Sequence, residues 1–190
     1  MVITYFGDGS YRFQSGETSF LVDSQNNRLK ADVYLKTLAP PGELSPKEDE
    51  IIFPGEYETK GIEIKGVSLS KESTAKFLKT IYLVQFEGVK ILLLGHASEI
   101  PDTKILEQLD DPDVVVVPVG GGPFLSAKDA SKLMKQMEPA IVLPSFYKNL
   151  NEFFKEFGHK TDFEEKFVFK KKDLEGVENK VVALEAKSEK

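Results

Sequence analysis

The sequence predicts an α/β protein in which two β-sheets pack face to face and helices lie outside them. Short segments of alternating apolar residues fill the first half of the 190-residue chain, which is typical of strands. The second half alternates helices with apolar strands, and residues 114–117 are four consecutive valines, as expected of a strand buried on both faces. Such an order favours a layered sandwich. We expect one domain over residues 1–186 and a frayed tail at 187–190.

The strands of the first half are separated by polar turns. Residues 4–23 predict a hairpin around a Ser15-Gly16-Glu17 turn, and Asp23 at its end is expected to hold the following loop through side-chain hydrogen bonds. Residues 80–86 and 89–94 predict a second hairpin around a Glu-Gly turn. The loop at 38–50 is stiffened by prolines. Further strands are predicted at residues 31–37, 51–53 and 61–70.

Each of the three predicted helices has a start or stop signal. The first has Asp102 as its N-cap. The second begins after Ser126, with Asp129 at the position of the acid in a capping box. The third covers residues 150–157 and ends at Gly158. Further strands are predicted at residues 114–117, 140–143, 167–170 and 180–185.

The composition excludes several classes of protein. The net charge is −6 and the lysines are spread along the chain, which gives no support to binding of nucleic acid or an anionic membrane. Without cysteine the chain has no disulfide, thiolate catalysis or cysteine-bound metal. No apolar run approaches the ~20 residues of a membrane span, and the N-terminus lacks the features of a signal peptide. We therefore expect a cytoplasmic protein.

A series of short motifs is more specific than the composition. They are Thr4-Tyr5-Phe6-Gly7, Phe20-Leu21-Val22-Asp23, residues 31–37, Pro54-Gly55-Glu56-Tyr57-Glu58, Gly61-Ile62-Glu63-Ile64, Leu94-Gly95, residues 113–121 and residues 138–144. Their order and spacing resemble the metallo-β-lactamase superfamily, in the branch of small metal-dependent hydrolases related to the ascorbate-6-phosphate lactonases. The resemblance covers about residues 3–147. It implies a metallo-β-lactamase-like four-layer αβ/βα sandwich.

The resemblance also implies where metal ligands should stand, and most of those positions hold other residues. The family places a His-x-His-x-Asp-His motif after the position of Thr37, a further His in the connection 68–75, a Gly-Asp pair at Gly95-His96, often a His three residues after that Asp, and a last His after Pro144-Ser145. The motif positions here hold Leu38, Pro40, Gly42 and Glu43, and the later ones hold His96, Glu99 and Phe146. Leucine, proline and glycine side chains cannot bind a metal. The resemblance thus implies a vestigial pocket with no metal, no cofactor and no catalytic residue.

Two features of this pocket leave alternatives open. His96 is one of two histidines, and a lone His there is typical of a hydrogen-bonded structural residue. With Glu99 and Glu43 it could also form a weak one-metal site of nitrogen and oxygen ligands. The Gly120-Gly121-Gly122 loop before a helix could bind an anion, or could simply allow close approach of the backbone.

The sequence therefore predicts a catalytically degenerate protein of this fold that acts as a binding or assembly module. Its partner would be another protein or a second copy of the chain. The first alternative is a residual one-metal hydrolase of a phosphorylated or lactone substrate. The second is a metal-free anion binder.

Overall fold

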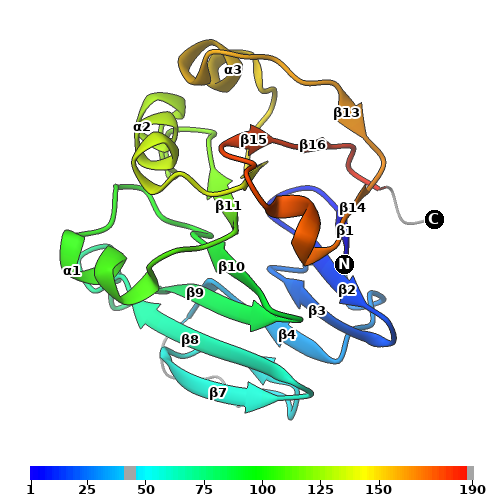
Figure 1. Ribbon diagram of the computed structural model, residues 1–190. Coiled ribbons are helices and arrows are strands. Elements are labelled where there is room, and N and C mark those ends of the chain that lie inside the picture. Colours follow the sequence, from blue (N-terminus) through cyan, green and yellow to red (C-terminus); the bar gives the residue numbers. More distant parts are fainter. Residues whose placement is uncertain (41–45, 188–190) are drawn as a thin grey trace.

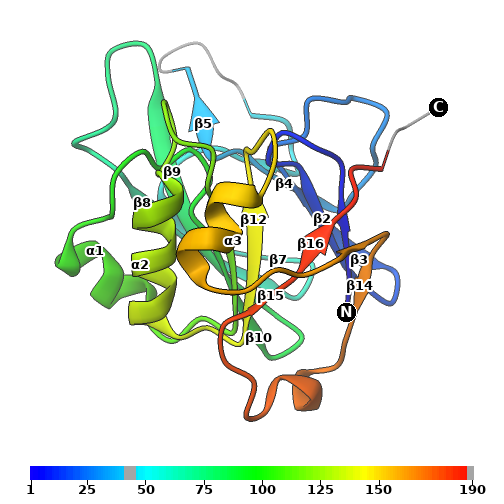
Figure 2. The same ribbon diagram turned by 90° about the horizontal axis from the view of Figure 1, so that it is seen from above.

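A computed structural model describes residues 1–40 and 46–187 of the chain. Two large β-sheets face each other, and the three α-helices of the described residues lie on the outer side of the larger sheet (Figures 1 and 2). The predicted arrangement of facing sheets with helices outside is confirmed.

The six-stranded sheet is built mainly from the N-terminal part of the chain. In order across the sheet its strands are β14 (Phe167–Val168), β1 (Val2–Tyr5), β2 (Tyr11–Ser15), β3 (Thr18–Val22), β4 (Val33–Leu35) and β6 (Glu50–Ile51). The predicted first hairpin is β2 and β3, which pair antiparallel. On the outer face, the Arg12 guanidinium donates to the carbonyl of Lys30 at 2.6 Å and the Tyr34 hydroxyl donates to that of Leu29 at 3.2 Å. These bonds hold a loop against the outside of the sheet.

The eight-stranded sheet contains the predicted second hairpin, and it continues into parallel strands. In order its strands are β15 (Lys180–Val181), β12 (Ile141–Ser145), β11 (Val114–Pro118), β10 (Val89–Leu93), β9 (Leu78–Phe86), β8 (Ile62–Ser68) and β7 (Gly55–Thr59), with β5 (Leu38–Ala39) paired to β9. All of β11 is buried because parallel β10 and β12 flank it and a helix layer covers one face. A separate two-stranded sheet joins β13 (Phe163–Glu164) to β16 (Ala183–Leu184).

The helices follow the predicted caps in two cases out of three. They are α1 (Thr103–Leu106), α2 (Ala127–Met137) and α3 (Asn151–Phe157), with 3-10 turns η1 (Glu107–Leu109) and η2 (Lys171–Leu174). Ser126 Oγ accepts from the Asp129 N–H at the start of α2, and Gly158 ends α3 with φ 103°. The first helix is four residues long and continues directly into η1, and the Asp102 side chain makes no capping bond but pairs with Lys71 at 2.9 Å. In the described part of the chain, every helix falls short of the length and apolarity of a membrane span.

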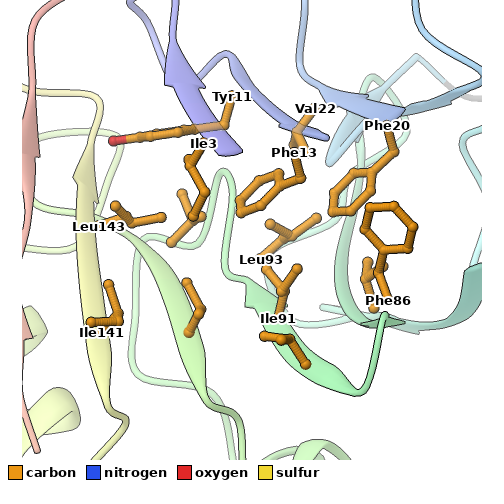
Figure 3. Close-up of a cluster of buried hydrophobic side chains, with 14 of the residues drawn as sticks. Ile3, Tyr11, Phe13, Phe20, Val22, Phe86, Ile91, Leu93, Ile141 and Leu143 are labelled. Carbon is orange, nitrogen blue, oxygen red and sulfur yellow. The ribbon is translucent and has the colours of Figure 1, made fainter. Parts of the chain in front are cut away.

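Large apolar side chains fill the space between the sheets (Figure 3). Phe13 and Phe20 stack with ring centroids 4.7 Å apart, and Phe86 from the opposite sheet meets Phe20 edge-on at 5.9 Å. The hydroxyl of buried Tyr11 donates to the Pro144 carbonyl at 2.7 Å, so its polar atom is satisfied. This bond fixes the end of β12 against the smaller sheet.

Candidate functional site

The candidate site lies where strands of both sheets end. Thr37 comes after β4 and Asp23 directly follows β3 in the smaller sheet. His96 comes after β10, and Phe146 directly follows β12. Since β10 and β12 are both parallel to β11, the residues after them leave the sheet at the same end. The Thr80 N–H donates to the Thr37 carbonyl at 3.0 Å and joins the two sets of strands.

A chain of hydrogen bonds connects Asp23, Thr37 and His96. Asp23 Oδ1 accepts from the Thr37 N–H at 2.8 Å, and Oδ2 accepts from the Thr37 hydroxyl at 2.5 Å. The same hydroxyl oxygen lies 2.7 Å from Nδ1 of His96. Asp23 and Thr37 are buried, with 5% and 1% of their surfaces exposed. The prediction that Asp23 holds the loop directly after it is wrong, because its carboxylate binds a residue fourteen positions later.

These bonds set the state of the imidazole. With Asp23 ionised, the single hydroxyl proton of Thr37 goes to its carboxylate, so Nδ1 of His96 carries the proton that it shares with Thr37 and Nε2 is left as an acceptor. Burial lowers the pKa of His96 by more than Asp23 raises it, and the charge of Lys79 lowers it further. Burial also raises the pKa of Asp23, against the opposing effects of His96 and Thr37. The imidazole is therefore neutral at neutral pH.

Phe146 fills the space beside His96. Its ring centroid lies 4.6 Å from that of His96, and it stacks on Phe124 at 4.4 Å. Two glycines make room for it: a Cβ at Gly9 would lie 2.1 Å from the Phe146 ring, and a Cβ at Gly120 would lie 1.9 Å from the Phe146 carbonyl oxygen. Phe146 has φ 51°, which is uncommon for a bulky residue. The surrounding packing thus holds this side chain in one place.

Replacing Gly9 with alanine is expected to destabilise the protein because the new methyl group would overlap the Phe146 ring. The matched control is Gly16→Ala, since Gly16 also has positive φ but has nothing within 4 Å of the new Cβ. In urea unfolding, Gly9→Ala should lose roughly 1–3 kcal/mol more than Gly16→Ala. The excess should shrink in a Phe146→Ala background. Equal losses in the two glycine variants would contradict this packing.

The other predicted pocket residues that the structure describes differ in how far they are buried. Leu38 is half-buried, and it pairs with Lys79 in the β5–β9 ladder. Pro40 is exposed. Glu99 is also exposed, and its N–H donates to the carboxylate of Glu72. Gly42 and Glu43 lie outside the described residues.

The described donors around His96 do not fit a metal centre. Within residues 1–40 and 46–187, no group of three or more His, Cys, Asp or Glu side chains is arranged to hold a metal ion. A catalytic zinc usually takes three protein ligands. Both oxygens of Asp23 and Nδ1 of His96 already make hydrogen bonds with Thr37, so His96 could offer Nε2 alone, which is one ligand of the three. The alternative site of His96, Glu99 and Glu43 includes Glu43, which lies outside the described residues, so this site stays a prediction.

A charged network near the same strand ends was missed in the sequence. Nζ of Lys79 lies 2.8 Å from Oε2 of Glu72, which also accepts from the Ser98 N–H at 2.8 Å and the Ser98 hydroxyl at 2.6 Å. Burial raises the pKa of Glu72, but these hydrogen bonds outweigh it and hold the pKa below its usual value. One signal was available. Lys79 and buried Ile81 are two residues apart in β9, so their side chains point to the same face of the sheet and the charge of Lys79 needed a partner.

Phe124 and Phe146 also line a groove of about 710 Å³. The Gly120-Gly121-Gly122 loop forms part of its wall. The helix after this loop is already capped by Ser126, whose hydroxyl donates to the Asp129 carboxylate at 2.7 Å, so a negative charge stands at that terminus. The charged residues that line the groove are Asp8, Lys148 and Glu152.

Comparison with known proteins identifies similar sequences. The profile described as "Beta-lactamase superfamily domain" matches residues 2–145. A UPF0173 metal-dependent hydrolase of Natranaerobius thermophilus is 27% identical over 66 residues, which are 35% of this chain and 30% of that protein. A UPF0173 metal-dependent hydrolase of Methanosarcina barkeri is 23% identical over 115 residues, covering 60% of this chain and 48% of that protein. The matches thus span less than half the length of these curated relatives.

Solved structures share the fold. One from Thermotoga maritima, described as a zinc-dependent hydrolase of the metallo-β-lactamase superfamily, superposes with a TM-score of 0.77 at 22% identity, covering 96% of this chain and 97% of that one. A metallo hydrolase of Ignicoccus hospitalis gives a TM-score of 0.64 at 17% identity, covering 89% and 99%. The predicted metallo-β-lactamase-like sandwich is confirmed.

Proposed function

We propose that this chain, which belongs to the β-lactamase superfamily, is a catalytically degenerate member that acts as a binding or assembly module. Hydrolysis by a metal-bound hydroxide needs several protein ligands and one open coordination position. Phe146 is the observation that carries the proposal. At the position where the resemblance places the last His ligand, an aromatic ring packs 4.6 Å from the imidazole of His96.

The neighbouring positions support the same conclusion. Leu38 and Pro40 stand where the resemblance places two further His ligands, and neither side chain has a lone pair. His96 is held by Thr37 through Nδ1, so it could offer a metal ion Nε2 alone, and one ligand is fewer than a catalytic metal site needs. The Thr37 hydroxyl is no substitute nucleophile, because the residue is only 1% exposed and its hydroxyl already bonds Asp23.

The groove over Phe124 and Phe146 is the surface that we assign to the partner. It combines two half-buried aromatic rings with a glycine loop that has no side chains, so a partner can approach its backbone closely. Acidic and basic side chains both line its walls. This mixture of apolar floor and polar walls is typical of a surface that binds protein segments or small molecules.

Elemental analysis of protein purified without chelator tests the proposal. We expect much less than one zinc or manganese per chain, and no change in unfolding temperature when either ion is added. The matched control is His96→Ala. One metal ion per chain in the wild type that is lost in His96→Ala would instead support the residual one-metal hydrolase. A rise in unfolding temperature with millimolar phosphate would support the anion binder.

A further inference from the structure

Lys79 lies beside a position that the resemblance assigns to the first metal ligand. In the antiparallel β5–β9 ladder, Lys79 pairs directly with Leu38. Its ammonium is also close enough to His96 to lower the pKa of that imidazole. A fixed positive charge therefore stands next to the strand ends where the resemblance expects a metal ion.

The carboxylate of Glu72 gathers donors from separate segments around this ammonium. Oε2 accepts from Nζ of Lys79 and from the N–H and hydroxyl of Ser98, and Oε1 accepts from the Glu99 N–H at 3.2 Å. Nζ of Lys79 also lies 3.4 Å from Ser98 Oγ. Glu72 lies in the connection between β8 and β9, and Ser98 lies in the loop after β10. Both segments are places where the resemblance expects metal ligands.

Burial distinguishes this ion pair from an ordinary surface pair. The side chains of Lys79 and Glu72 are 16% and 10% exposed. Lys71 and Asp102 also connect the β8–β9 segment to residues beyond β10, but their side chains are 77% and 50% exposed. Removing one partner of a buried pair leaves an uncompensated charge, whereas exposed pairs contribute little.

We propose that the Lys79 ammonium, paired with the Glu72 carboxylate, is a fixed positive charge of the protein itself. It joins the segments that the resemblance places around a metal ion. This inference rests on the proposed function, because it assigns to a protein side chain a joining role that a bound metal would otherwise have. The pair joins β9, the β8–β9 connection and the loop after β10 within the chain itself.

A double-mutant cycle tests this role. Lys79→Met and Glu72→Gln should each lower the folding equilibrium constant roughly 10- to 100-fold in urea unfolding, since each leaves its partner without a counter-charge. The double variant should lose much less than the product of the two single effects. Lys71→Met and Asp102→Asn are the matched controls, and each should change the constant by less than about 5-fold. Hydrogen exchange at the Ser98 and Glu99 amides should accelerate in Glu72→Gln.

Two results would overturn the inference: additive effects of Lys79→Met and Glu72→Gln, or losses no larger than those of the Lys71 and Asp102 controls. Its failure is distinguishable from failure of the proposed function. A bound metal ion in the wild type would refute the proposed function. Additive variants in a chain shown to be metal-free would refute only the role of Lys79.

Discussion

Replacing Asp23 with alanine is expected to lower the free energy of unfolding by ~3–5 kcal/mol. The variant would leave both the N–H and the hydroxyl of buried Thr37 without their acceptor. It would also remove the carboxylate that orients Thr37 towards His96. Urea unfolding followed by circular dichroism would measure the loss.

Asp23→Asn is the matched control for this prediction. Asparagine keeps one acceptor oxygen, and it tolerates the left-handed conformation at φ 46°. We therefore expect it to lose about half as much stability as Asp23→Ala, on the order of 2 kcal/mol. A loss below ~1 kcal/mol for Asp23→Ala would show that the Asp23–Thr37 bonds are not needed for folding.

Replacing Phe20 with alanine should cost ~3–5 kcal/mol, because it opens a cavity between the two sheets. Phe20 stacks on Phe13 and meets Phe86 from the opposite sheet, so one substitution removes contacts on both sides of the core. Phe77→Ala is the control, since Phe77 is 47% exposed. It should change the stability by less than ~1 kcal/mol. Similar losses in the two variants would mean that the facing sheets do not pack through Phe20.

The sequence was sufficient to predict the layers because apolar periodicity reports burial directly. The valines at 114–117 and the capped helix after Ser126 both lie where they were expected. The helix after Asp102 begins where it was expected, but the proposed capping carboxylate is used in an ion pair with Lys71 instead. Such competition between local and distant partners is not visible in a local pattern.

The site was less predictable than the fold because its bonds join residues that are distant in the sequence. Thr37 and His96 are 59 positions apart, and their contact depends on how the ends of two sheets meet. Glu72 and Ser98 are 26 positions apart and are joined in the same way. The order of the strands was enough to predict that His96 and Phe146 lie at strand ends. It could not predict which residues they contact there.

Under the proposed function, the position of Phe146 makes a functional metal site difficult to build by single substitutions. A histidine introduced at this position would leave Leu38 and Pro40 unchanged, and neither can contribute a donor atom. It would also remove the ring that packs on Phe124 above Gly9, so the first step would lose stability before any activity appeared. Under the proposed function, a stability barrier separates the chain from a metal-dependent hydrolase, and several coordinated substitutions would be needed to cross it.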